Sequence, residues 1–159
     1  LLTGAAGLFG YNFYLNNKRF NLIPIENKKK INLKNKIKLD LLKKNKLKKT
    51  ILNLKPDIIV HAAALTNIEK CESNKKLAKH INFEVTKNIV ECSKKLNCKL
   101  VFISTDHLFR KKKNYFKESD LTNPLNFYAI TKKKSEEIII NNLRNFLISF
   151  SFRPIYFII

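Results

Sequence analysis

Short apolar runs of strand length recur along the chain, and most of them show no alternation of apolar and polar positions. Strands that are apolar on both faces are typical of a parallel sheet that is covered on both sides. The run at 57–61, which directly follows Pro56, is the clearest example. The runs that we expect to form strands are 1–3, 20–25, 37–39, 57–61, 99–104 and 147–152.

Segments with apolar residues at helical spacing separate most of these runs. In 41–54, for example, lysines occupy the face opposite the apolar one. Alternation of strands with helices predicts an α/β fold, a doubly wound parallel sheet of the Rossmann type with helices on both faces. Polar, lysine-rich stretches at 27–36 and 110–123 are expected to be loops. The segments that we expect to form helices are 7–18, 41–54, 77–96 and 128–142.

The glycines of the chain all lie in its opening, at Gly4, Gly7 and Gly10. A strand, a glycine turn and a helix in that order suit the pyrophosphate of a dinucleotide. Glycine lets backbone N–H groups approach the phosphates, and the helix N-terminus adds partial positive charge. We therefore assign Gly4, Gly7, Leu8, Phe9 and Gly10 to cofactor binding. Spacing alone also allows a strand-to-helix turn that holds no ligand.

Two further stretches bear on a cofactor. Glu26 lies about twenty residues beyond the glycine turn, where a carboxylate accepts hydrogen bonds from an adenosine ribose and favours NAD. The lysines at 28–30 follow after Asn27 and would instead hold a 2′-phosphate, so the cofactor is NADP or NAD. Glu26 is alternatively a solvated turn residue. Ala62, Ala63 and Ala64 leave room for a flat ligand above the sheet, although close packing explains them equally.

The formal net charge of +20 comes almost wholly from lysine, because arginine occurs only at 19, 110, 144 and 153. Such a charge usually indicates nucleic acid or an anionic membrane as a partner. Asparagine and isoleucine are also abundant and tryptophan is absent, which indicates a general drift in composition. A selected nucleic-acid face would use arginine and interleaved aromatic residues. We expect no specific nucleic acid and no membrane as partners, although a basic nucleic-acid-binding module is the alternative.

The cysteines at 71, 92 and 98 form no C-x-x-C pair and have no histidine at metal-ligand spacing. They therefore predict no metal site and fit structural thiols in a reducing compartment. The sequence shows no signal peptide and no apolar run of the roughly 18 residues that a membrane span needs. These features together predict a cytoplasmic location.

Tyr128 and Lys132 lie four residues apart in an expected helix and therefore share one face. A nearby ammonium favours the tyrosinate, so we predict that the pKa of Tyr128 is lowered and that it exchanges a proton with a substrate oxygen. Thr105 follows Ser104 and precedes Asp106 at the carboxyl end of a strand, where it can hydrogen-bond the same oxygen. With a dinucleotide turn, these residues predict a carbonyl reductase that transfers hydride from nicotinamide.

Five stretches of the sequence then occur in a recognisable order. They are TGAAGLFG at 3–10, PDIIVHAAALTNIEKCES at 56–73, INFEVTKNIVE at 81–91, LVFISTDHLF at 100–109 and ESDLTNPLNFYAITKKKSEE at 118–137. On these stretches the chain resembles an extended short-chain dehydrogenase/reductase, and more narrowly the dTDP-4-dehydrorhamnose reductase group of nucleotide-sugar enzymes.

The resemblance implies roles for single residues. Thr105, Tyr128 and Lys132 would be the catalytic trio, Lys132 would also hold the nicotinamide ribose, and Asn82 would support that lysine. Arg153 would precede the substrate-binding loops. Asp40 and Leu41 would lie near the adenine, Ala62, Ala63 and Ala64 would pass beside the cofactor, and Thr66, Thr105, Asp106 and Tyr128 would face the substrate.

The implied function is an NAD(P)-dependent reductase of a 4-keto nucleotide sugar in deoxysugar and polysaccharide biosynthesis, with a homodimer as its expected assembly. Two alternatives are a nucleotide-sugar epimerase or dehydratase of the same superfamily and a non-catalytic, cofactor-sensing regulatory subunit. The chain lacks methionine, begins within a strand and ends in an apolar run. We therefore expect 1–159 to be an NAD(P)-binding Rossmann domain, a fragment without its N-terminal start and with the substrate domain truncated.

Overall fold

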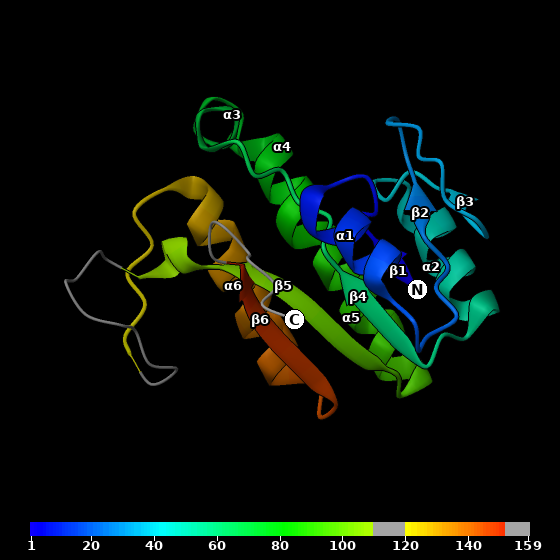
Figure 1. The fold of residues 1–159 in the computed structure, drawn as a ribbon. Helices are drawn as coiled ribbons and strands as arrows, with labels where there is room; N and C mark the ends of the chain where they lie inside the picture. Colours follow the sequence, from blue (N-terminus) through cyan, green and yellow to red (C-terminus); the bar gives the residue numbers. More distant parts are fainter. Residues whose placement is uncertain (110–119, 152–159) are drawn as a thin grey trace.

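Parallel strands form the centre of the molecule, which the computed structural model describes over residues 1–109 and 120–151 (Figure 1). The strands are β1 (Leu2–Thr3), β2 (Ile25–Glu26), β3 (Ile37–Lys38), β4 (Ile58–His61), β5 (Lys99–Thr105) and β6 (Phe146–Ser151). β1, β4, β5 and β6 pair in that order, β2 pairs with β3, and a bridge between Leu2 and Pro24 joins the two groups. The lateral order β3-β2-β1-β4-β5-β6 is that of a doubly wound sheet.

Helices connect the strands, and side chains or backbone conformations mark their ends. They are α1 (Leu8–Asn16), α2 (Lys44–Leu54), α3 (Ile68–Ser73), α4 (Lys75–Lys79), α5 (Val85–Leu96) and α6 (Phe127–Asn142), with a π-helical turn η1 (His80–Glu84) and a 3₁₀ turn η2 (Asp106–Leu108). Asn126 begins α6, because its side-chain oxygen accepts the N–H of Ala129 (2.8 Å). Lys55, with a φ of 45°, ends α2 in the left-handed conformation.

The two faces of the sheet bury different side chains, because neighbouring residues of a strand point to opposite sides. On one face Ile59, Leu100 and Phe102 are fully buried in a core to which α2, α5 and α6 contribute. On the other face Leu2 and Val60 belong to a second core against which α1 packs. Helices on both faces of a parallel sheet confirm the predicted α/β, doubly wound fold.

The strand register brings the loops after three strands to one edge. Thr3 at the end of β1 pairs with His61 at the end of β4, and His61 pairs with Phe102 of β5. β5 continues beyond this pairing to Thr105. The carboxyl edge of the sheet therefore carries the glycine turn, the loop after β4 and the end of β5.

The segment from 62 to 96 differs most from the sequence-based expectation of one helix over 77–96. Asn67 and Asn74 each cap a short helix, accepting the N–H of Lys70 (2.7 Å) and of Leu77 (2.9 Å). These caps create α3, which the sequence analysis missed, and α4. The π-helical turn η1 then separates α4 from α5, and such turns are frequent at functional sites.

The other elements are close to expectation, with small shifts. The run at 20–25 forms a strand only at Ile25–Glu26, although Leu2 N–H still reaches the carbonyl of Ile23 (2.9 Å). The expected helix over 41–54 begins only at Lys44. The expected strand at 147–152 is β6, but residue 152 and Arg153 lie outside the described residues, as do 110–119 of the expected loop.

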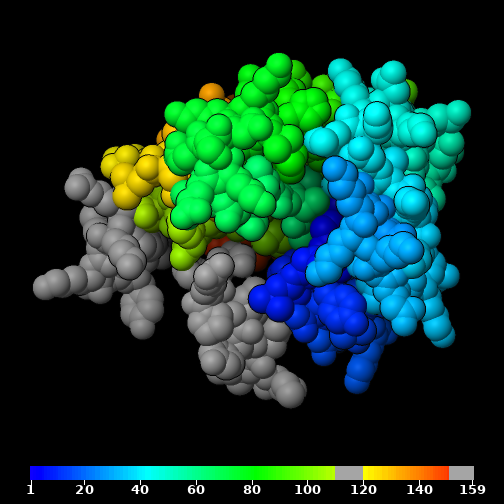
Figure 2. Space-filling view, turned by 90° about the horizontal axis from the view of Figure 1, so that it is seen from above, coloured from blue at the N-terminus to red at the C-terminus, as the bar shows by residue number. Residues whose placement is uncertain are grey.

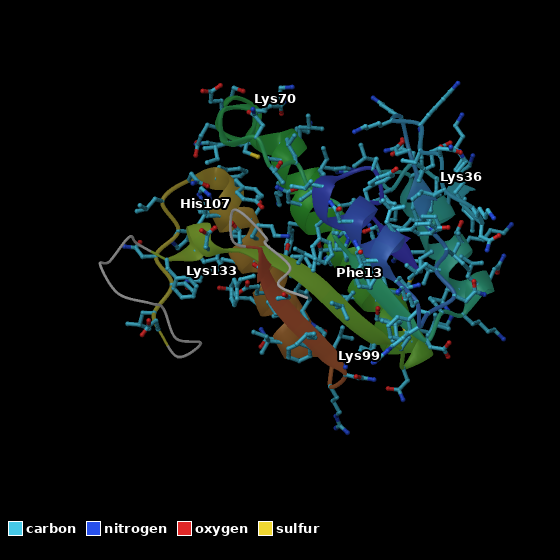
Figure 3. All side chains as sticks on the ribbon, viewed as in Figure 1. Phe13, Lys36, Lys70, Lys99, His107 and Lys133 are labelled. Atoms are coloured by element: carbon cyan, nitrogen blue, oxygen red, sulfur yellow. The ribbon has the colours of Figure 1, made fainter. Side chains whose placement is uncertain are left out.

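None of the helices described is both long and apolar enough to cross a bilayer. Within the same residues, no group of three or more His, Cys, Asp or Glu side chains is placed to hold a metal ion. The lysines labelled in Figure 3, Lys36, Lys70, Lys99 and Lys133, lie on different parts of the molecule.

Replacing Ile89 by alanine should lower the free energy of unfolding by about 2–5 kcal/mol. The Ile89 side chain is fully buried in the core shared by α2, α5 and α6, so its truncation leaves a cavity. Ile140→Ala is the matched control on the exposed side of α6, where the side chain is 55% exposed, and should cost less than about 0.5 kcal/mol. Urea denaturation followed by circular dichroism measures both, and equal losses would contradict this core.

Candidate active site

The turn between β1 and α1 lies directly against the loop that follows β4. Gly4 has a φ of +74°, which favours glycine, and its carbonyl oxygen accepts the N–H of Gly7 (2.9 Å). A Cβ on Gly4 would lie 2.5 Å from the carbonyl carbon of Ala62 and 2.6 Å from the nitrogen of Ala63. A Cβ on Gly10 would in turn meet the Gly4 backbone, 2.8 Å from its carbonyl carbon. Glycine is therefore required for these backbones to approach.

A groove of about 280 Å³ lies over this turn, near the lower end of the roughly 300–1,000 Å³ typical of small-molecule sites. Figure 2 looks onto this part of the surface, where the dark blue N-terminal residues lie beside the green and light blue ones. The groove is lined by Gly4, Gly7, Asn27, Leu41, Leu42, Ala62, Ala63, Ala64, Ile81 and Val85. It thus brings together predicted cofactor residues from three parts of the chain.

Some lining residues were missed, and some predicted residues lie outside the lining. Ile81 and Val85 are apolar helix residues that carry no cofactor signal in the sequence, and Asn27 follows the more conspicuous Glu26. Leu8 is 83% exposed, and Phe9 stacks on Phe13 with ring centroids 5.9 Å apart. Gly7, which caps α1, offers no side-chain acceptor, so no side chain caps the first N–H groups of α1.

The carboxylates expected near the adenosine are engaged by the protein. Glu26 is buried, and its Oε2 accepts hydrogen bonds from the N–H of Ile31 (2.8 Å) and from Lys36 Nζ (2.9 Å). These contacts lower the pKa of Glu26. Asp40 Oδ1 accepts the N–H of Leu42 (3.0 Å). Lys29 Nζ reaches the glycine turn and donates to the carbonyl of Ala6 (3.2 Å).

Thr105 and Tyr128 meet at the carboxyl edge of the sheet. Both are buried, and the Thr105 hydroxyl lies near enough to the Tyr128 phenol to lower its pKa. Thr105 also accepts the N–H of His107 (3.2 Å), and the His107 ring lies edge-on to the Tyr128 ring, with centroids 6.2 Å apart. Asp106 Oδ1 accepts from the Thr105 hydroxyl (3.4 Å). A hydroxyl and a phenol therefore converge where the sequence analysis placed them, beside the loop that carries Asp106.

Lys132 does not act on the phenol as the sequence analysis expected. Its Nζ donates to the carbonyl of Ile103 (2.6 Å) and lies 3.8 Å from the centroid of the Phe102 ring. Burial raises the pKa of Tyr128, and the nearby Thr105 hydroxyl only partly opposes this. The predicted lowering of the Tyr128 pKa is therefore wrong in this structure, because desolvation dominates and the Lys132 ammonium is held against β5.

Asn82, on the π-helical turn, joins the loop after β4 to α6. Its Oδ1 accepts the N–H of Leu65 (2.7 Å), and its Nδ2 donates to the Leu65 carbonyl and to Thr131 Oγ1 (both 3.1 Å). It thus contacts the residue that precedes Lys132 rather than the lysine. Thr66, the next residue of the loop, is exposed.

His61, which the sequence analysis did not select, extends this polar network to the glycine turn. Its Nδ1 lies 2.7 Å from Thr3 Oγ1, and its Nε2 lies 3.1 Å from Thr86 Oγ1. Because Thr86 donates its own hydrogen to the carbonyl of Asn82 (2.7 Å), it accepts from His61, which places the proton on Nε2. Burial, together with the charge of Lys132, lowers the pKa of His61 to about 3, so the imidazole is neutral.

The RmlD substrate binding domain family matches residues 1–150. The chain belongs to this family. Membership confirms the resemblance found in the sequence, and the parallel sheet with helices on both faces agrees with it.

Two curated relatives carry different names. The dTDP-4-dehydrorhamnose reductase of Salmonella typhimurium is 35% identical over 100 residues, 62% of this chain and 33% of that protein. Methionine adenosyltransferase 2 subunit beta of Bos taurus is 28% identical over 142 residues, 89% of this chain and 42% of that protein. The chain thus spans less than half the length of either relative.

Solved structures with a similar fold include proteins named dTDP-4-dehydrorhamnose reductase. A hypothetical dTDP-4-dehydrorhamnose reductase from Sulfolobus tokodaii superposes with a TM-score of 0.79 at 36% identity, over 86% of this chain and 50% of that chain. The dTDP-4-dehydrorhamnose reductase from Bacillus anthracis, in complex with NADP, has a TM-score of 0.81 at 24% identity over 94% of this chain and 51% of that one, and shares the fold.

Gly4→Ala should destabilise the protein by about 1–3 kcal/mol, because alanine is strained at φ +74° and its Cβ would contact the backbone of the loop after β4. Gly7→Ala is the matched control, since its Cβ would lie 3.2 Å from the Gly4 carbonyl oxygen and its φ is negative. In thermal unfolding, the melting temperature should be highest for the wild type, lower for Gly7→Ala and lowest for Gly4→Ala. A Gly4→Ala melting temperature equal to that of the wild type would contradict the close approach.

Proposed function

We propose that residues 1–159 form the dinucleotide-binding domain of an NAD(P)-dependent reductase of the dTDP-4-dehydrorhamnose reductase type, which reduces a 4-keto nucleotide sugar for deoxysugar and polysaccharide synthesis. The observation that carries this proposal is the meeting of Thr105 and Tyr128 at the sheet edge that also bears the glycine turn. Membership of the RmlD family and the name of the Salmonella typhimurium relative support it.

The residues around the groove suit a dinucleotide. Gly4 and Gly7 leave backbone exposed in the groove lining, and no side chain caps the first N–H groups of α1. Leu41, Ala63 and Val85 offer apolar surface to a flat ring. When bound, the nicotinamide supplies a hydride for the substrate carbon.

The surroundings of Glu26 favour NADPH over NADH. Its Oε2 already accepts hydrogen bonds from the Ile31 N–H and from Lys36 Nζ. It is therefore less available to accept hydrogen bonds from the adenosine ribose of NADH. Lys29 already lies at the glycine turn, where a cation would stabilise a 2′-phosphate. The Bacillus anthracis relative, whose structure contains NADP, is consistent with this preference.

The buried phenol suits the reductive direction of the reaction. Because burial raises the pKa of Tyr128, its proton stays on the phenol oxygen at neutral pH and is available to a substrate oxygen. Thr105, beside Tyr128, can donate to the same substrate oxygen and stabilise its developing charge when its hydroxyl turns away from Asp106 Oδ1. Lys132 is assigned to the nicotinamide ribose, for which it must leave the carbonyl of Ile103.

A regulatory subunit is the second candidate, because the Bos taurus relative is named a subunit of methionine adenosyltransferase 2 and matches 89% of this chain. In that case the groove would bind a dinucleotide and Tyr128 would not take part in turnover. The juxtaposition of the buried Thr105 and Tyr128 side chains favours the reductase.

In the full-length protein, Tyr128→Phe should lower kcat for 4-keto nucleotide-sugar reduction by about 10²–10⁴-fold, because the general acid is lost. The affinity for NADPH should stay close to that of the wild type. Tyr11→Phe is the control, since Tyr11 is on α1, 41% exposed. NADPH absorbance measures turnover, and NADPH fluorescence measures binding.

Unchanged turnover in Tyr128→Phe would contradict the proposed role of the phenol. A wild-type protein that binds NADPH, reduces no keto-sugar and purifies with a partner enzyme would favour the regulatory subunit instead.

A further inference from the structure

Two side chains accept backbone N–H groups at the start of α6. The first N–H groups of a helix have no partner within the helix, so other atoms must accept their hydrogens. Asn126 accepts the N–H of Ala129 (2.8 Å). The N–H of Phe127, the first residue of α6, is donated to Glu72 Oε1 on α3 (2.6 Å). A carboxylate suits this place, because a helix N-terminus carries partial positive charge.

Lys75 contacts both partners of this hydrogen bond. Its Nζ lies 3.8 Å from Glu72 Oε2 and 5.6 Å from the centroid of the Phe127 ring. The ion pair itself contributes little, because the Lys75 and Glu72 side chains are 62% and 44% exposed. The charge-assisted hydrogen bond from the Phe127 N–H is therefore the stronger contact of Glu72.

α3 is also packed against the phenol that α6 carries. Cys71, which precedes Glu72, forms a buried cluster with Ala78 and Tyr128, and Phe127 packs against this cluster. The Cys71 thiol donates to the carbonyl of Leu65 (3.3 Å), in the loop after β4. α3 therefore connects the loop that lines the cofactor groove to the start of the helix that bears Tyr128.

Tyr128 lies where loss of the Glu72 contact would matter most. It is the second residue of α6, and helices fray from their ends. A loosened first turn would displace the Tyr128 ring, which lies edge-on to the His107 ring, with centroids 6.2 Å apart, and beside Thr105. Lys132 lies one turn further along, where the intrahelical hydrogen bonds are complete, so its place depends less on Glu72.

We propose that Glu72 is a positioning residue: by accepting the Phe127 N–H, it fixes the first turn of α6 and thereby holds the Tyr128 phenol beside Thr105. This inference rests on the general-acid role given to Tyr128 in the proposed function. It assigns a purpose to α3, whose place in the fold would otherwise be unrelated to the reaction.

In the full-length protein, Glu72→Ala should lower kcat for keto-sugar reduction by about 10–100-fold, as expected when a reacting group is slightly misplaced. The affinity for NADPH should stay close to that of the wild type, because the groove and Lys132 keep their places. Glu72→Gln keeps an oxygen that accepts the Phe127 N–H and should recover most of kcat. Wild-type kcat in Glu72→Ala would overturn the proposal, and so would equal losses in the two variants.

Glu69→Ala is the matched control, because it removes the same side chain from an exposed position one turn earlier on α3. Its kcat should equal that of the wild type. Equal losses in Glu69→Ala and Glu72→Ala would assign the effect to α3 as a whole and overturn the proposal.

A double-mutant cycle separates positioning from a general structural role. In a Tyr128→Phe background, Glu72→Ala should cause no further loss of kcat, because Glu72 acts through the phenol that is already absent. Losses that multiply in the double variant would overturn the proposal in favour of a structural role.

Nuclear magnetic resonance of the full-length protein reports the place of the phenol without any substrate. A cross-peak between the ring hydrogens of His107 and Tyr128 should be present in the wild type and in Glu72→Gln, and much weaker in Glu72→Ala. An unchanged cross-peak in Glu72→Ala would overturn the proposal. Failure of the wild type to reduce a keto-sugar would instead contradict only the proposed function, because this readout does not depend on turnover.

Discussion

The close approach of two backbones, at Gly4 and at Ala62–Ala63, is the constraint on which the site depends. A side chain at Gly4 would lie 2.5 Å from the Ala62 carbonyl carbon, so the first turn and the loop after β4 can touch only where glycine stands. Thr3 strengthens the same junction, because its Oγ1 accepts the N–H of Ala63 (3.3 Å) and bonds His61. The groove exists because these two loops meet beneath it.

A buried network of polar side chains connects this junction to α6 across the sheet. Its links run from Thr3 through His61 and Thr86 to Asn82, and from Asn82 to Thr131. A neutral His61 satisfies every donor and acceptor in this chain, whereas a charged imidazole would force one hydroxyl to turn away. The strand that ends in the glycine turn and the helix that carries Tyr128 are thereby fixed relative to one another.

The fold, and the sheet edge at which the predicted residues gather, could be predicted from the sequence because they rest on local signals. The apolar run at 57–61, the three glycines of the opening and the four-residue spacing of Tyr128 and Lys132 each report on neighbours in sequence. The charge states of Tyr128 and Lys132 could not be predicted in the same way, because the groups around them are distant along the chain. Lys132, for example, donates to the carbonyl of Ile103, twenty-nine residues away. For the same reason, the burial of Tyr128, which raises its pKa, became visible only in the structure.

Titration of this chain with NADPH, followed by the amide signals of ¹⁵N-labelled protein, tests the central claim most directly. Saturable shifts should appear at Gly7 and Leu8 in the first turn and at Ala63 and Ala64 in the loop after β4, because these backbone amides surround the groove. Absence of saturable binding, or shifts confined to lysine-rich surfaces away from the glycine turn, would contradict the account.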